Sequence, residues 1–194
     1  MEGTNSIPSD LPAYSPPESP REHSRAPREL TVHTYELMNS KKRPWVVLKV
    51  IDKAASSAHL PHIYEGEPIE GTVDLNLEKD VQIKSVSIAV SGEIITTNTT
   101  IHTFIRIVKE LWSTAVGDPS ALSLTTGSPF KGKLRGQFSW PFSIRLPAEV
   151  ELLFEQSIRT FKLPASFNAR GSLVTVNYRI SVNITRGKFQ TECK

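Results

Sequence analysis

The feature that most constrains the fold is a strict alternation of apolar and polar residues near the C-terminus. Over residues 174–184, every second residue is large and apolar, and the residues between them are polar. Successive side chains of an extended strand point to opposite faces, so a period of two predicts one long strand with one buried face. The residues of this apolar face are Val174, Val176, Tyr178, Ile180, Val182 and Ile184.

Two further stretches show the same alternation. Residues 138–146 place large apolar side chains at every second position, and residues 69–77 do so less regularly. Both are expected to be strands. Pro141 lies inside the first stretch and has no N–H to donate, which favours an edge strand or a bulge. The apolar residues concerned are Phe138, Trp140, Phe142, Ile144 and Leu146, and Ile69, Val73, Leu75 and Leu77.

The stretch 81–95 changes phase midway. Val81 and Ile83 occupy one phase of the alternation, and Val86 and Ile88 occupy the other, which Val90 continues. A phase change inside one apolar strand is typical of a β-bulge. The bulge is expected to redirect the second half of the strand, as happens where strands cross between sheets.

Weaker strand patterns occur at 31–37, 45–51 and 101–112, and the last also fits an amphipathic helix. Residues 113–136 are rich in Ser, Thr and Gly and are expected to form a long mobile loop. Many strands separated by Gly and Pro turns favour an all-β fold, an immunoglobulin-like antiparallel β-sandwich. The turn signals lie at 65–68, 117–120, 127–129 and 170–172.

The first 28 residues differ from the rest of the chain. They contain six of the 14 prolines, several Ser and charged residues, and few large apolar side chains. Such a segment cannot bury enough apolar surface to offset its loss of conformational entropy. We therefore divide the chain into a disordered arm, residues 1–28, and one sandwich domain, residues 29–194.

A short motif in this arm resembles a known peptide ligand. Leu11, Pro12, Ala13 and Tyr14 match the L-P-x-Y variant of the P-P-x-Y ligand of WW domains. A polyproline II segment loses little entropy when it docks, and a tyrosine adds a large amphipathic anchor. Leu11, Pro12 and Tyr14 are therefore the candidate WW-domain-binding residues. A chance match in a proline-rich segment is the alternative.

Motifs for catalysis or metal binding fail on inspection. Residues 127–133 match the phosphate-loop spacing G-x-x-x-x-G-K, but Leu134 replaces the Ser or Thr that would hold magnesium, and a strand is expected to follow instead of a helix. His59 and His62 lie three apart with no third ligand nearby. The Asp and Glu residues are interpreted as lying on solvent faces. We expect no catalytic residue, no metal and no cofactor, and an enzyme that uses the phosphate-loop-like segment is the alternative.

Charge and cysteine content exclude other classes. The formal net charge is +3, which is too small and too mixed in sign to favour a nucleic-acid partner. The single cysteine, Cys193, cannot form an intramolecular disulfide, which fits a reducing compartment. No signal peptide and no apolar stretch of about 18 residues is present, so we expect a cytoplasmic protein without a transmembrane segment.

Two blocks resemble the arrestin N-terminal domain. Residues 64–92 resemble the family pattern Y-x-x-G-(D/E)-x-I-x-G, here with one residue fewer between Tyr64 and Gly66, followed by a strand that ends in Gly. Residues 138–187 are similar to the series F-x-F-x-(I/L)-x-(L/I)-P, L-P-x-S-F and V-x-Y-x-I-x-V-x-I-x-R. The matches span about residues 44–188 in the family's order. They resemble the α-arrestin branch in particular, which includes the fungal arrestin-related trafficking adaptors.

The resemblance implies a non-enzymatic cytoplasmic adaptor. α-Arrestins link membrane transporters and receptors, through their cytoplasmic segments, to WW-domain ubiquitin ligases at the plasma membrane or endosomes, and so promote endocytosis. The family has two sandwich domains and this sequence contains one, so we expect a fragment or a single-domain relative. A retromer-like coat subunit or structural interaction subunit without a ubiquitin role is the alternative. No motif identifies the cargo-binding residues.

Overall fold

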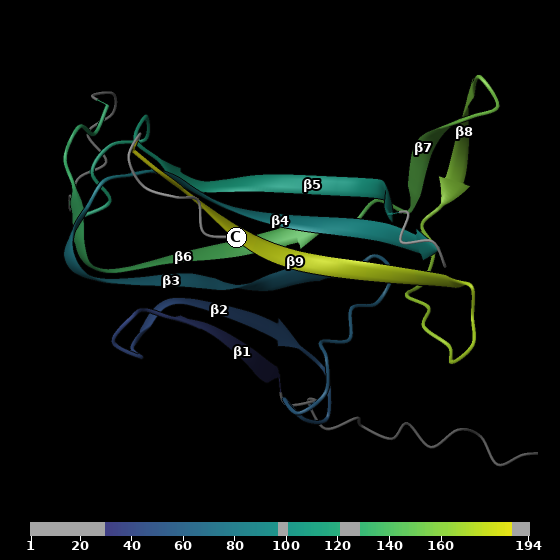
Figure 1. Ribbon diagram of the computed structural model, residues 1–194, viewed down its shortest axis with the longest axis horizontal. Coiled ribbons are helices and arrows are strands. Elements are labelled where there is room, and N and C mark those ends of the chain that lie inside the picture. The colour runs from purple at the N-terminus through teal and green to yellow at the C-terminus, as the bar shows by residue number, and fades with distance from the viewer. Residues whose placement is uncertain (1–29, 97–100, 121–128, 188–194) are drawn as a thin grey trace, which may run out of the picture.

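The computed structural model describes residues 30–96, 101–120 and 129–187. These residues contain nine strands and no helix, which confirms the all-β prediction (Figure 1). The strands are β1 (Thr31–Met38), β2 (Pro44–Asp52), β3 (Pro68–Val81), β4 (Ile83–Thr96), β5 (Ile101–Ser113), β6 (Leu134–Arg145), β7 (Glu149–Phe154), β8 (Ser157–Lys162) and β9 (Val174–Arg186).

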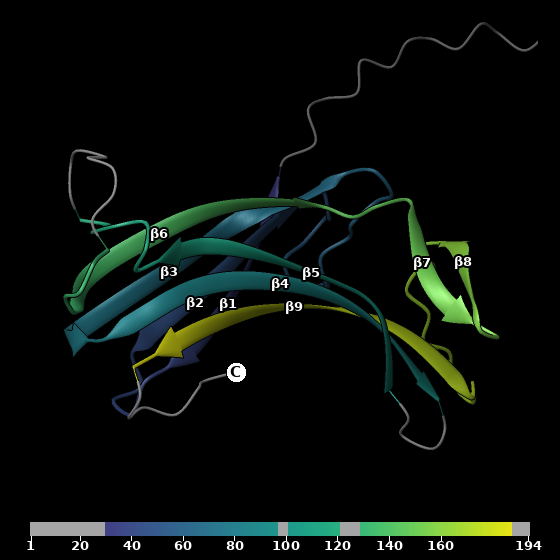
Figure 2. The ribbon, with the colours of Figure 1, turned by 90° about the horizontal axis from the view of Figure 1, so that it is seen from above.

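The strands form two large antiparallel sheets and one small hairpin. The first sheet has the order β1-β2-β3-β6, the second has the order β5-β4-β9, and β7 pairs with β8. The long strands run along the length of the molecule, and the β7–β8 hairpin lies beyond them at one end (Figures 1 and 2). This arrangement confirms the predicted antiparallel sandwich.

The structure confirms the two strands that the clearest alternating patterns predict. β9 covers the whole alternation at 174–184, and Ile184 is buried on its inner face. β6 buries Phe138 and Phe142 while Pro141 points to solvent. β6 is also an outer strand of its sheet, where a residue without an N–H is tolerated.

The stretch 81–95 is not one strand, and that part of the expectation is wrong. Val81 ends β3 in the first sheet, Ile83 begins β4 in the second, and Gln82 is the crossing point between the sheets. The backbone oxygen of Gln82 accepts a hydrogen bond from the Gly187 N–H. A register shift between Ile83 and Ser85 confirms the bulge, but the chain has already changed sheets before it.

The helical alternative for residues 101–112 is also wrong. β5 pairs with β4 along its length, and two register shifts in that ladder explain why its apolar spacing departs from two. The weaker strand patterns at 31–37 and 45–51 are confirmed as β1 and β2. The loop expected at 113–136 is confirmed in its described parts, 114–120 and 129–133, whereas Ser113 belongs to β5 and residues 134–136 belong to β6; its mobility stays a prediction.

The core lies between the two sheets. Trp112 of β5 stacks on Trp140 of β6 with ring centroids 6.4 Å apart, and Trp140 stacks on Phe138 at 5.7 Å. These rings join the edges of the two sheets on one side of the sandwich. The buried cluster comprises Trp45, Val46, Val50, Ile69, Val73, Leu75, Leu77, Ile83, Val86, Ile88, Val90, Trp112, Leu134, Phe138, Phe142, Ile144 and Ile184.

Candidate interaction site

The candidate residues Leu11, Pro12 and Tyr14 lie outside the described residues. The phosphate-loop-like segment lies partly outside them too, and its described part leads into β6, a strand, as expected. His59 and His62 lie in the connection between β2 and β3. Over the described ranges, no group of three or more His, Cys, Asp or Glu side chains is placed to hold a metal ion.

One acidic residue departs from the solvent-face interpretation. Asp52 is buried at the end of β2, where its Oδ1 lies 2.9 Å from Nε2 of the buried His33. The same oxygen accepts from the Ala54 N–H at 2.9 Å, and Oδ2 accepts from the His62 N–H at 2.5 Å. Burial raises the pKa of Asp52, but these hydrogen bonds and His33 lower it by more, so its pKa lies below the ordinary value. The pair anchors the β2–β3 connection.

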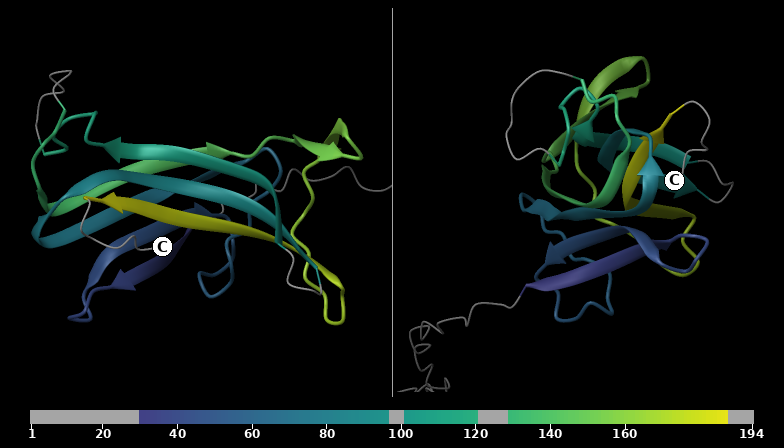
Figure 3. Two further views of the ribbon diagram at one scale, coloured as in Figure 1. Left: turned by 45° about the horizontal axis from the view of Figure 1, so that its top comes forward. Right: turned by 90° about the vertical axis from the view of Figure 1, so that its left-hand side faces the viewer.

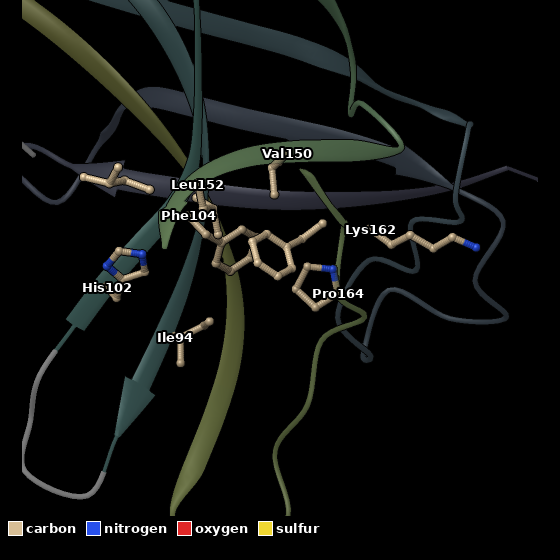
Figure 4. Close-up of a pocket in the computed structure, with 9 residues that line it drawn as sticks. Ile94, His102, Phe104, Val150, Leu152, Lys162 and Pro164 are labelled. Atoms are coloured by element: carbon tan, nitrogen blue, oxygen red, sulfur yellow. The ribbon is translucent and has the colours of Figure 1, made fainter. Parts of the chain in front are cut away.

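An apolar pocket opens at the hairpin end of the molecule. It lies between the adjoining ends of β4 and β5 and the β7–β8 hairpin, and its volume is about 360 Å³ (Figure 4). Pockets of this size and composition hold apolar groups. The lining residues are Ile94, His102, Phe104, Val150, Leu152, Leu153, Phe161, Lys162 and Pro164.

An aromatic pair lies at the base of the pocket. Phe104 packs edge-on against Tyr178 of β9, with ring centroids 5.7 Å apart. The Tyr178 hydroxyl donates to the Pro164 oxygen at 2.5 Å, which ties the segment after β8 to the second sheet. Burial raises the pKa of Tyr178, so the hydroxyl stays protonated and able to donate. Gly92 lies under this group because a Cβ there would overlap the Phe104 ring.

The hairpin forms the wall of the pocket. Val150 of β7 is buried and pairs with Phe161 of β8. A two-residue turn joins the strands, and both of its residues, Glu155 and Gln156, have positive φ angles of 46° and 66°. Positive φ at both positions is typical of a type I′ hairpin turn.

Apolar side chains continue from the pocket onto the surface. Leu153 is 78% exposed and Ile158 is 72% exposed, both on the hairpin. Contiguous exposed apolar surface of this kind is typical of interaction sites. Two lining residues are ionisable, His102 and Lys162, and they lie on opposite sides of the pocket in Figure 4. The arrangement can receive an apolar side chain of a partner.

Sequence reasoning missed this site because it missed the hairpin. Val150 and Leu152 do alternate with acidic residues, which is the one local signal of a strand there. Glu155 and Gln156 carry no turn signature, since type I′ turns favour Asn and Gly. The partners from β4 and β5 lie about fifty residues earlier in the chain, so no motif could join them.

A comparison with protein families decides the classification. The family model described as "Arrestin (or S-antigen), N-terminal domain" matches residues 58–194, which is more than half of the chain.

The chain belongs to the arrestin family.

This finding confirms the resemblance to the arrestin N-terminal domain and its sandwich, whereas the α-arrestin branch stays a prediction. Membership indicates a non-enzymatic adaptor role in trafficking and the binding of cargo proteins. A search of curated proteins found no match. No helix in the described part of the arrestin chain is long and apolar enough to cross a membrane.

Proposed function

We propose that this arrestin is a trafficking adaptor of the α-arrestin branch. Its hairpin-end pocket binds a cytoplasmic segment of a membrane transporter or receptor. Leu11, Pro12 and Tyr14 of the arm recruit a WW-domain ubiquitin ligase, and the ligase then modifies the cargo for endocytosis. This role requires that the protein acts in the cytoplasm and is recruited to the plasma membrane or endosomes.

The pocket is the observation that carries the proposal. It offers a preformed apolar cavity beside the exposed Leu153 and Ile158 on an arrestin sandwich. Burying one Leu or Phe side chain of a ligand contributes about 1.5–3 kcal/mol, which by itself gives only weak binding. Weak and reversible binding suits an adaptor that must release its cargo after the ligase has modified it.

The cargo half is tested by photo-crosslinking in cells. A photoreactive amino acid replaces Leu153 at the pocket rim, and a matched control replaces the exposed Ser139 on the outer face of β6. We expect crosslinks to membrane transporters or receptors from position 153, and their loss when Leu152→Arg is added. Equal crosslinking from both positions would show that the pocket does not select cargo.

The ligase half is tested by a pull-down of WW-domain proteins with the whole chain. Tyr14→Ala is expected to abolish binding, whereas Tyr64→Ala is the control, since Tyr64 is a loop tyrosine that is 54% exposed. Absence of WW-domain binding by the unmodified chain would exclude ligase recruitment by this motif. Stable co-purification in a fixed complex, independent of ubiquitin, would instead favour the coat-subunit alternative.

A further inference from the structure

Basic side chains gather at the end of the sandwich opposite the β7–β8 hairpin. Three parts of the chain meet there: the β1–β2 turn, the β3–β4 crossing and the connection that enters β6 (Figure 1). Val81 of β3 pairs with Leu134 of β6, and the Lys84 oxygen accepts a hydrogen bond from the Thr114 N–H. We call this surface the basic end, and define it by the exposed Lys and Arg side chains of residues 41–43, 79–84 and 131–135.

The β1–β2 turn presents three consecutive cations on a fixed backbone. Asn39 Oδ1 accepts hydrogen bonds from the backbone N–H groups of Lys41 and Arg43 at 2.9 and 3.1 Å. Backbone bonds from Lys42 N–H to the Asn39 oxygen and from Asn39 N–H to the Arg43 oxygen close the turn at 2.9 and 2.8 Å. Because the backbone is already ordered, these cations lose little conformational freedom when they bind an anionic surface.

The carboxylates at this end leave most of the cations unneutralised. Glu78 is shared by two of them, with Oε1 2.6 Å from Arg43 and Oε2 3.7 Å from Lys41. Asp118 accepts a hydrogen bond from a backbone N–H of its own turn, and Asp80 is exposed. Like charges gathered at one end repel each other, so an anionic surface placed against them is favoured. The cations that form no ion pair among the described residues are Lys42, Lys79, Lys84, Lys131, Lys133 and Arg135.

The cations are spread over an area rather than along a line. They lie at the ends of strands from both large sheets, since β3 and β6 belong to the first sheet and β4 belongs to the second. A single acidic side chain contacts only part of such an area, whereas a membrane surface that contains anionic lipids contacts all of it at once.

One exposed apolar side chain lies beside these cations. Val116 is 62% exposed, and its N–H donates to the Ser113 oxygen, next to the residue whose N–H bonds to Lys84. Binding to a lipid interface strengthens both with attraction to anionic lipids and with the apolar area that enters the boundary between headgroups and acyl chains. The basic end offers both contributions.

From these observations we propose that the basic end docks on a membrane surface that contains anionic phospholipids. The Lys and Arg side chains lie against the headgroup phosphates, and Val116 enters the headgroup layer. Because the attraction is mainly electrostatic, the contact is reversible and weakens as the ionic strength rises. The inference goes beyond the proposed cargo and ligase contacts and does not depend on what the pocket or the arm binds.

This docking sets the distance between the pocket and the membrane. β3 and β4 have 14 residues each and run from the basic end toward the hairpin end. At about 3.3 Å per residue, a strand of this length extends for about 45 Å. A chain that stands on its basic end therefore holds the hairpin-end pocket away from the headgroups, where it meets cytoplasmic segments instead of membrane-embedded ones.

The test measures co-sedimentation of the whole chain with lipid vesicles. We expect binding to vesicles of phosphatidylcholine mixed with phosphatidylserine, and at least about tenfold weaker binding to phosphatidylcholine alone. Lys42→Glu combined with Lys79→Glu should weaken binding to the mixed vesicles by at least about tenfold. Arg145→Glu combined with Arg170→Glu is the matched control, because it makes the same change of charge at exposed positions toward the other end, and it should change affinity by less than about twofold.

Two additional measurements separate the membrane from other partners. Val116→Asp should weaken vesicle binding by about threefold, because a carboxylate replaces the side chain that enters the headgroup layer. A soluble oligoglutamate peptide at equal charge should not displace the chain from the mixed vesicles. All the substituted side chains are exposed, so the variants should unfold at the same urea concentration as the unmodified chain.

Three outcomes would overturn the proposal. Equal binding to both kinds of vesicle would exclude recognition of anionic lipids. Equal weakening by the two pairs of substitutions would assign the attraction to the overall charge or to the basic residues of the arm. Displacement by the peptide would assign the basic end to an acidic segment of a protein partner.

Discussion

At the scale of single residues, the buried polar side chains hold connections rather than perform chemistry. The Asp52 carboxylate accepts bonds from the His33 ring and from the Ala54 and His62 N–H groups. Two of these donors belong to the β2–β3 connection, so one side chain holds that connection both at Ala54 and at His62, ten positions beyond Asp52. A buried carboxylate that is fully bonded in this way stabilises its loop, whereas the same group without partners would destabilise it.

Asp52→Asn should therefore lower stability and change its pH dependence. We expect a loss of about 1–3 kcal/mol at neutral pH, because an amide cannot satisfy the same three donors. Since the folded pKa of Asp52 lies below 3.8, its contribution is present above that pH and is lost as the pH falls through the lower folded value. Urea unfolding at several pH values measures both effects. Asp80→Asn, at an exposed site, is the control.

Tyr178→Phe tests the hydroxyl that closes the base of the pocket. The substitution keeps the ring against Phe104 and removes the donor to the Pro164 oxygen. We expect a loss of about 0.5–1.5 kcal/mol in urea unfolding, with faster hydrogen exchange in residues 163–167. No change in either quantity would mean that the hydroxyl contributes nothing to holding this segment.

At the scale of elements, the hairpin is the part whose local sequence agrees least with its conformation. Glu155 and Gln156 both adopt positive φ, where residues with a Cβ are disfavoured. The flanking strands are short, and the described side chains of β8 are exposed. The two turn residues therefore adopt a backbone conformation that they do not favour. The pairing of β7 with β8, together with the packing of Val150 onto the sandwich, imposes that conformation.

Replacing Glu155 and Gln156 by Asn and Gly should stabilise the hairpin. Asn-Gly is the favoured type I′ pair, and the exposed Arg159–Glu155 contact at 3.5 Å that is lost contributes little. We expect hydrogen exchange of β7 and β8 amides to slow by about two- to fivefold. Replacing both residues by alanine is the control, because it removes the same side chains without favouring positive φ, and exchange should not slow.

The strands that could be predicted from sequence are those whose burial is regular. β9 and β6 each have one face on the core, so their alternation survives along the strand. The break at Gln82 could not be placed, because a change of sheet and a bulge leave the same phase slip. The Asp52–His33 pair spans nineteen positions along the chain and leaves no local pattern. The pocket depends on three separate segments that only the fold brings together.

At the scale of the whole molecule, the sandwich and the hairpin differ in how much buried core stabilises each of them. The large sheets share one buried cluster, which contains no residue of β7 or β8. The hairpin lies at one end of the sandwich (Figure 3). The pocket residues of the hairpin face those of β4 and β5. Cores of this kind unfold as one unit, whereas peripheral hairpins open separately.

Native-state hydrogen exchange should distinguish global unfolding of the sandwich from local opening of the hairpin. We expect amides of β3 and β4 to exchange only through global unfolding, and amides of β7 and β8 to exchange more than about tenfold faster. Added urea should accelerate the β3 and β4 amides much more steeply, because global unfolding exposes more surface. Equal exchange and equal urea dependence in both groups would show that the hairpin belongs to the cooperative core.

The placement of the three tryptophans has an optical consequence. Trp112 and Trp140 are stacked inside the sandwich, Trp45 lies under the Arg186 guanidinium, and none lines the hairpin-end pocket. Intrinsic fluorescence of the arrestin is therefore blind to a ligand in that pocket. A ligand that draws the guanidinium away from the Trp45 indole, however, changes the emission of that chromophore.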